Sequence, residues 1–207
     1  MIAAGAHSGR PNTVSGGGTP YLNNSGGFAA TLSGNSWQEG PYGGSAAAVP
    51  GTVQAENYNT GGQGVAYNVN SVNGTANGYR ADGVDLEATG DTGGGYNLGW
   101  TSTGQWFRYT VDVAEAGVYS VAMRVAAPGA ANSAFHLADS SGTNLSGPVS
   151  VPATGGWQNW STVTAQVTLP AGRQTVTIYQ DNGGWNLNSL LFTTAGQGQS
   201  SPGRLKR

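Results

Sequence analysis

The sequence predicts an all-β protein, an antiparallel β-sandwich. Three observations predict this class: apolar and polar residues alternate in several short segments, turn residues separate these segments at regular spacing, and no segment shows a convincing 3.6-residue period. The 207 residues include 36 glycines, while charged residues make up only 9%. This balance suits short strands joined by many turns. At this length we expect one sandwich-sized domain with extra segments.

Four segments carry the alternation, over residues 105–113, 117–127, 160–170 and 173–180. A period of two places every second side chain on one face, as in a half-buried strand. The residues expected on the core faces are Phe107, Tyr109, Val111, Val113, Tyr119, Val121, Met123, Val125, Val163, Ala165, Val167, Leu169, Val176 and Ile178. These faces predict a single sandwich over residues 50–195.

The two ends of the chain have a different composition. Residues 1–49 hold Gly-, Ser- and Ala-rich runs with scattered apolar residues, which is typical of a linker or of the remnant of a preceding domain. The run FAATLSGNSW leaves open the alternative that part of this leader forms strands packed on the main body. Residues 196–207 are expected to be a flexible or appended tail.

Charge and composition exclude several functions. Residues 50–194 carry four arginines against nine Asp or Glu residues, a net charge of −5, which is the wrong sign for a phosphate-binding surface. We therefore expect no nucleic acid partner. No apolar stretch approaches the roughly 20 residues that a membrane span needs. The absence of cysteine excludes disulfides and thiolate metal sites.

The residue types give little support for a catalytic site. His7 lies in the leader and His136 at an alternating strand position, so the main body has no pair of histidines for a metal. Four carboxylates lie close together in the chain: Asp82, Asp85, Glu87 and Asp91. A glycosidase needs two carboxyl groups across one bond. Because a short strand and turn would place some of the four on opposite faces, we interpret them as a solvated turn.

Tryptophans beside amides in turn-like segments are the most informative feature. Trp100 follows NLG, Trp157 and Trp160 flank QN, and Trp185 precedes Asn186. Sugar rings have apolar C–H faces that lie flat on aromatic rings, and their hydroxyls need the donors and acceptors that Asn and Gln supply. The pattern favours binding of a neutral glycan. The alternative for each single tryptophan is a place in the core.

Residues 53–194 resemble family 6 carbohydrate-binding modules, β-jelly-roll domains of the galactose-binding-like type that are appended to bacterial glycoside hydrolases. The segments that carry the resemblance are VQAENY, GVDLEATGDTGGGYNLGWTSTGQWFRYTVDV, GVYSVAMRVAAPG, TGGWQNWSTV and GGWNLNSLLF. The resemblance implies a non-catalytic, monomeric module that targets a covalently linked glycoside hydrolase to a β-linked polysaccharide. β-1,3-Glucan or xylan is favoured, with agarose or cellulose as further possibilities.

The same resemblance implies a binding cleft formed by loops. Two aromatic rings, here Trp100 and Trp157, would sandwich a sugar, and the amide of Asn186 would hydrogen-bond it. Gln63 stands where an acidic or amide side chain often joins the cleft. At position 100 the family more often has Tyr, and Trp enlarges the stacking face.

A structural calcium ion between the first and last strands is also implied. Gln54, Glu56 and Asn188 match the positions of its ligands, although the family commonly has Asp at position 188. Their oxygens are of the kind that a hard cation requires. The alternative is an ordinary hydrogen-bond network at the strand edge.

The resemblance finally implies secretion, and we expect an extracellular protein whose export signal lies outside this chain. Two other functions stay open. One is glycoside hydrolase or lyase activity in the chain itself, and the other is a structural or protein-interaction sandwich.

Overall fold

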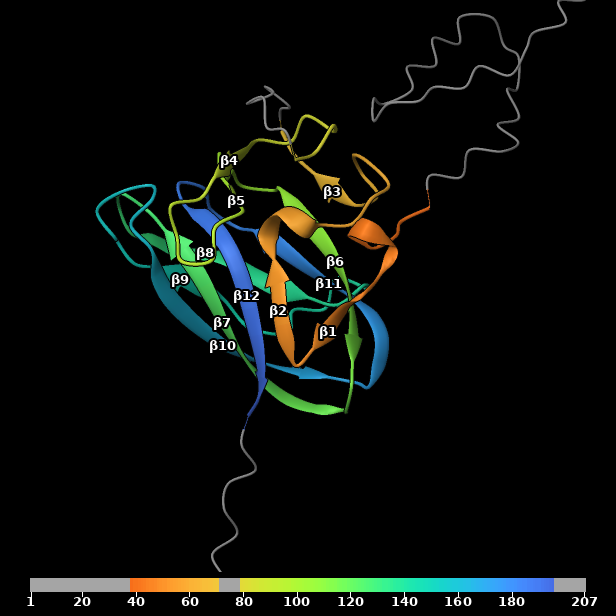
Figure 1. Cartoon of the computed structure of the whole chain (residues 1–207). Coiled ribbons are helices and arrows are strands. Elements are labelled where there is room, and N and C mark those ends of the chain that lie inside the picture. Colours follow the sequence, from red (N-terminus) through yellow and green to blue (C-terminus); the bar gives the residue numbers. More distant parts are fainter. Residues whose placement is uncertain (1–37, 71–78, 196–207) are drawn as a thin grey trace, which may run out of the picture.

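The structure is a computed structural model that describes residues 38–70 and 79–195, and it confirms the all-β sandwich (Figure 1). Two sheets are joined by loops and by two short 3-10 helices, η1 (Tyr42–Gly44) and η2 (Ala55–Asn57). Among the described residues no helix has the length and apolar character that a membrane crossing needs. His7 of the leader lies outside the described residues.

The first sheet has the strand order β1-β6-β11-β8-β9, with β3 paired to β6. Its strands are β1 (Ala47–Val49), β3 (Tyr67–Asn68), β6 (Trp106–Val113), β8 (Ala131–Ala138), β9 (Val149–Val151) and β11 (Gly172–Gln180). The second sheet has the order β10-β7-β12-β5-β4, with β2 paired to β12. Its strands are β2 (Gly51–Gln54), β4 (Leu86–Ala88), β5 (Tyr96–Leu98), β7 (Gly117–Ala126), β10 (Ser161–Leu169) and β12 (Asn186–Thr194).

The core lies between the two sheets and contains the side chains that the alternation predicts. On β6, Phe107, Tyr109, Val111 and Val113 are buried while their neighbours face outward. β7 repeats this pattern, whereas on β11 Val176 and Ile178 are buried together with Thr177 between them. On β10 Val167 and Leu169 are buried, whereas Val163 and Ala165 are only partly covered because β10 is an edge strand.

The folded domain begins earlier than residue 50, which corrects the predicted boundary. β1 pairs with β6 in parallel, the exception among otherwise antiparallel strand pairs, and Val49 is buried in the core. Glu39 accepts hydrogen bonds from Arg108 at 3.1 Å and from Asn59 at 2.6 Å. Part of the expected linker therefore packs on the main body. A three-residue strand has too short a pattern to stand out within a Gly- and Ser-rich segment.

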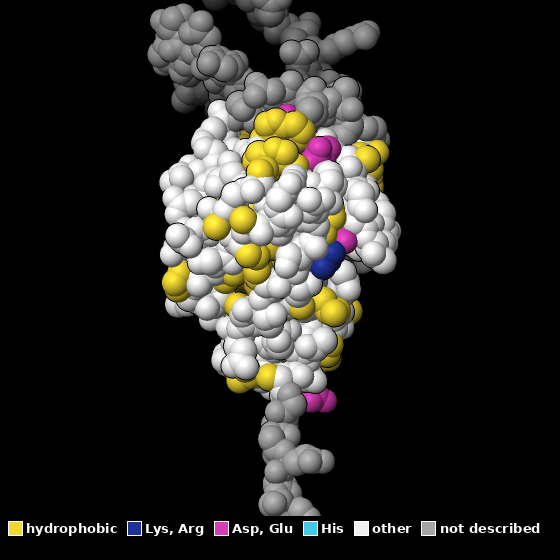
Figure 2. Space-filling view, turned by 90° about the vertical axis from the view of Figure 1, so that its left-hand side faces the viewer, with side chains coloured by type: hydrophobic (Ala, Val, Ile, Leu, Met, Phe, Trp, Pro, Cys, Tyr) yellow, Lys and Arg dark blue, Asp and Glu magenta, His cyan; other side chains and the backbone are white. Residues whose placement is uncertain are grey.

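A bulge in β12 shapes the region around Asn186 and Asn188. The pairing of β12 with β7 shifts register between Leu187 and Ser189, so Asn188 is the extra residue. A bulge redirects the side chains around it. In this way Asn186, Leu187 and Asn188 are all buried, which strict alternation does not allow. Charged side chains are sparse on the face shown in Figure 2.

Candidate functional site

Two tryptophan rings stand out from the surface on neighbouring loops. Trp100, just after β5, is 50% exposed, and Trp157, in the loop before β10, is 49% exposed. Trp100 also has a φ angle of +49°, in the left-handed region that costs an L-residue roughly 1–2 kcal/mol. A bulky residue held in that region at the surface is a common sign of a functional site.

Asn186 connects the loops that carry the two rings. Its buried side chain donates from Nδ2 to the carbonyl oxygen of Trp157 at 2.8 Å and to Glu87 Oε1 at 2.9 Å. Its Oδ1 lies against Gly99, where an added Cβ atom would be 3.2 Å away. The backbone before Trp100 and the backbone of Trp157 thus both contact this amide. The structure brings Trp100, Trp157 and Asn186 into one site.

Glu87 on β4 is a member of this site that the sequence analysis missed. Its Oε1 accepts hydrogen bonds from three side-chain amides, those of Asn97 at 3.2 Å, Gln158 at 2.9 Å and Asn186 at 2.9 Å. The interpretation of this carboxylate as part of a solvated turn is therefore wrong, because Glu87 lies on β4 among three amides. A glutamate in a three-residue strand has no local signature, because its amide partners come from residues 10, 71 and 99 positions away.

The other two tryptophans of this region have different roles. Trp185 is completely buried and stacks on Phe135, with ring centroids 4.6 Å apart, so it belongs to the core. Trp160 is partly buried, and its indole N–H donates to Gln158 Oε1 at 3.2 Å. The alternative of a core position therefore applies to Trp185 but not to Trp100 or Trp157.

Gln63 does not join these residues. Its side chain donates to Asn68 Oδ1 at 2.9 Å and to the carbonyl of Val69 at 3.0 Å, and it accepts from the Val69 amide at 3.1 Å. These bonds close its own loop beside β3, which belongs to the other sheet. In the described chain, Gln63 has no hydrogen bond to Glu87, Asn186 or either exposed tryptophan.

Two of the expected calcium ligands carry unpaired buried oxygens. Glu56 Oε1 accepts from the Tyr96 amide at 3.2 Å, while its Oε2 is buried and has no hydrogen-bond partner among residues 38–70 and 79–195. Asn188 donates to Asp91 Oδ2 at 2.9 Å, and its Oδ1 is likewise buried and unpaired. η2, which carries Glu56, packs against β12, which carries Asn188. An unpaired buried oxygen is costly, so the chemistry of this pair fits a cation.

Burial raises the pKa of the Glu56 carboxyl above its usual range, and the backbone amides of Glu56 and Tyr96 only partly oppose this. The neighbouring carboxyl of Asp91 behaves in the opposite way. The hydrogen bond from Arg124, with Nη2 2.6 Å from Oδ1, lowers the pKa of Asp91 most, and Asn188 lowers it further. Asp91 is thus paired with an arginine, whereas Glu56 forms no ion pair within the described chain.

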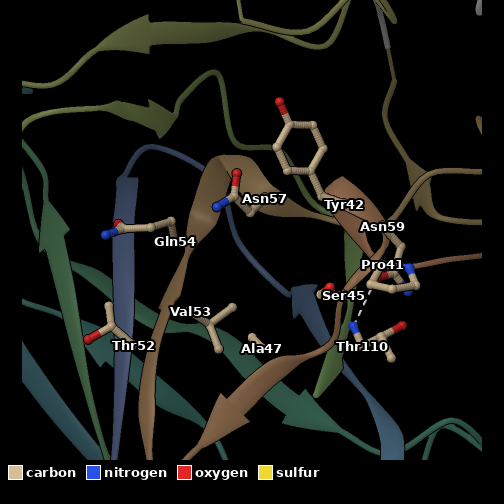
Figure 3. A pocket seen from close by; sticks show the side chains of 10 residues that line it. All are labelled: Pro41, Tyr42, Ser45, Ala47, Thr52, Val53, Gln54, Asn57, Asn59 and Thr110. Atoms are coloured by element: carbon tan, nitrogen blue, oxygen red, sulfur yellow. Dashed lines mark hydrogen bonds between the residues drawn. The ribbon is translucent and has the colours of Figure 1, made fainter. Parts of the chain in front are cut away.

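Gln54, the third expected ligand, lies on β2 beside a cavity of about 190 Å³ (Figure 3). One side of the cavity is formed by η1 and β1, and the other by β2 and η2. Its lining includes Tyr42, Ser45 and Asn57. Residue 54 also pairs with Ser189, the neighbour of Asn188. No residue of the tryptophan site lines this cavity, so the two are separate.

The remaining candidates for chemistry have structural partners. His136 Nδ1 is 2.7 Å from Asp181 Oδ2, and its ring stacks on Tyr179. Asp82 accepts from the Tyr58 hydroxyl at 2.8 Å and pairs with Arg80 at 3.0 Å. In residues 38–70 and 79–195, no three Asp, Glu, His or Cys residues form a metal-binding group.

Two exposed indoles on loops of this β-sandwich lie beside a hydrogen-bonded amide on β12 and a carboxylate on β4, an arrangement typical of carbohydrate-binding modules. Residues 75–194, more than half of the chain, match the profile described as carbohydrate binding module (family 6), and the chain belongs to this family.

Similar proteins include parts of larger chains. The chain is 35% identical over 111 residues to the clotting factor G alpha subunit of Tachypleus tridentatus, covering 53% of this chain and 16% of that protein. It is 34% identical over 98 residues to endo-1,4-beta-xylanase B of Cellvibrio japonicus, covering 47% of this chain and again 16% of the relative. The match therefore spans about a sixth of each relative.

Among solved structures, the family 6 module of Cellvibrio mixtus lichenase 5A in complex with cellotriose is 30% identical with a TM-score of 0.56, covering 72% of this chain and 99% of that one. A β-1,3-glucan binding family 6 module from Bacillus halodurans is 28% identical with a TM-score of 0.54, covering 72% and 100%.

Proposed function

We propose that this chain is a non-catalytic module that binds a neutral β-linked polysaccharide between Trp100 and Trp157. The observation that carries the proposal is the buried amide of Asn186, which contacts both tryptophan loops. Stacking on the indoles removes the apolar C–H faces of a sugar from water. Asn186 Oδ1 and Glu87 Oε2 have no hydrogen bond within the described chain, so they are acceptors for sugar hydroxyls.

Several similarities support β-linked glucans and xylan as ligands. One similar module was solved with cellotriose, another binds β-1,3-glucan, and a third relative is a xylanase. We place β-1,3-glucan and xylan ahead of cellulose and agarose. The composition of the site agrees with a neutral ligand, because Glu87 is acidic and its hydrogen-bond partners are amides.

We further propose that the module is secreted, acts as a monomer and targets a covalently linked glycoside hydrolase to its polysaccharide. The linkage to a catalytic domain is supported by a relative, because the matched segment is 16% of a xylanase. Anchoring raises the effective concentration of a catalytic domain at an insoluble substrate.

Affinity gel electrophoresis tests the function directly. The purified chain is run through gels that contain laminarin, xylan, a soluble cellulose derivative or agarose, with Trp100→Ala as the control. We expect at least one glycan to retard the wild-type chain and not the variant. A release assay on the same glycans should detect no new reducing ends. Hydrolysis by the purified chain would instead favour an enzyme, and no retardation would favour a structural sandwich.

We also propose that Glu56 and Asn188, with Gln54 beside them, hold a structural calcium ion. The unpaired oxygens Glu56 Oε2 and Asn188 Oδ1 support this, since calcium takes carboxylate, amide and carbonyl oxygens. A bound cation would compensate the buried carboxylate. Elemental analysis and melting curves with and without EDTA test the proposal.

A further inference from the structure

The side chain of Gln158 makes four hydrogen bonds behind the tryptophan site. Its Oε1 accepts from the Gly90 amide at 2.7 Å and from the Trp160 indole at 3.2 Å. Its Nε2 donates to Glu87 Oε1 at 2.9 Å and to Asn97 Oδ1 at 3.0 Å. Gln158 directly follows Trp157, so one amide joins the tryptophan loop to the β4–β5 hairpin.

Gln158 is one of three amides that bind the carboxylate of Glu87. Three amide N–H groups converge on Oε1, and hydrogen bonds to an ionised acceptor are stronger than those between neutral groups. Oε2 has no partner in the described chain and is not among its buried unpaired atoms. The carboxylate therefore has one oxygen fixed by the protein and one that solvent or a ligand reaches.

We propose that Gln158 is the positioning residue of the site, which holds Glu87 Oε2 ready to accept a hydrogen bond from a sugar hydroxyl. This inference rests on the proposed glycan-binding function. Gln158 contacts no sugar itself and acts through Glu87. A preorganised acceptor strengthens binding because little side-chain freedom is lost when the ligand arrives.

The test measures glycan affinity at a temperature far below unfolding, so that stability does not enter. Gln158→Met keeps the unbranched shape but removes the donor and the acceptor. Gln158→Glu keeps an acceptor for Gly90 and Trp160 and replaces the donor that faces Glu87 with a carboxylate oxygen. The matched control is Gln166→Met, at an exposed position of β10. Each is combined with Glu87→Gln and titrated with laminarin and xylan oligosaccharides by calorimetry.

We expect Gln158→Met and Glu87→Gln each to weaken binding about tenfold, which corresponds to about 1.4 kcal/mol, and the double variant to be hardly weaker than either. In the Gln158→Glu background, Glu87→Gln should improve binding, because it removes the repulsion of two carboxylates. Gln166→Met should bind as the wild type does.

Wild-type affinity in a folded Gln158→Met variant overturns the positioning role. The role is also overturned if the loss of affinity in the double variant equals the product of the two single-variant losses, because the two residues then act independently. If Gln158→Met does not fold, Gln158→Glu with and without Glu87→Gln decides the question, and an absent improvement overturns it. If the wild-type chain binds a glycan and Trp100→Ala does not, any of these results rejects the role of Gln158 but leaves the proposed glycan-binding function intact. When the wild-type chain binds no glycan, the proposed function fails as well.

Discussion

Nδ2 of Asn186 donates a hydrogen bond to the carbonyl oxygen of Trp157 at 2.8 Å, which fixes the backbone of an exposed tryptophan to the first residue of a core strand. The second N–H of the same amide is bound to Glu87. Both donors of Asn186 are thus used within the protein, and Oδ1 is the polar atom of this side chain that the described residues leave without a hydrogen bond.

Asn186→Ala and Asn186→Asp should therefore differ in stability although both lose binding. In the alanine variant, the carbonyl oxygen of Trp157 and Glu87 Oε1 each lose one hydrogen-bond donor, at a cost of about 1–3 kcal/mol. The aspartate variant additionally places a carboxylate oxygen near Glu87 Oε1, so it should unfold more easily still. Urea unfolding at neutral pH compares the two. Equal stability would show that the bond to Glu87 is unimportant.

Trp100→Ala and Trp157→Ala should each weaken glycan binding about 5- to 30-fold, since losing one stacking face costs on the order of 1–2 kcal/mol. Both rings are about half exposed, so the melting temperature should hardly change. Phe107→Ala, which empties a core position, should instead destabilise the protein by about 3–5 kcal/mol. Calorimetric titration and thermal melting separate these effects. Wild-type affinity in both folded tryptophan variants would refute the site.

Trp100→Gly should be more stable than Trp100→Ala by about 1 kcal/mol, the reverse of the usual order. The reason is the φ angle of +49° at this residue, which glycine adopts without the steric cost that a Cβ atom brings. Both variants should lose glycan binding equally. Denaturant unfolding gives the comparison, and an alanine variant at least as stable as the glycine one would contradict it.

The stabilising effect of calcium should depend on pH through Glu56. Because burial raises the pKa of this carboxyl, the folded chain without metal holds the proton more tightly than the unfolded chain, and its stability falls as pH rises through the raised pKa. Calcium needs the ionised form, so the increase in melting temperature on adding calcium should be larger at about pH 7 than at about pH 4. Melting curves in excess calcium and in excess EDTA measure this difference.

Glu56→Gln is the matched control for calcium. It keeps the shape of the side chain but removes the buried charge, so it should melt at a higher temperature than the wild type in EDTA and gain little from calcium. A wild-type response to calcium in this variant would remove Glu56 from the metal site.

The sequence by itself determined the class of fold and the core faces of its long strands. The alternation in β6, β7, β10 and β11 assigns side chains to two faces, and burial of one face leaves little freedom in how such strands pack. The tryptophan and amide segments favoured a glycan site, and the family resemblance selected Trp100, Trp157 and Asn186 among them, because residue type alone did not separate the exposed tryptophans from the buried Trp185.

Only the tertiary structure decided which polar groups meet. Glu87 and Gln158 lie 71 positions apart, and neither residue type nor spacing marks their hydrogen bond. The same applies to the bulge at Asn188, to the local role of Gln63 and to the pairing of β1 with β6. Hydrophobic periodicity is a local property of the chain, whereas a buried hydrogen bond depends on two distant segments arriving at the same place.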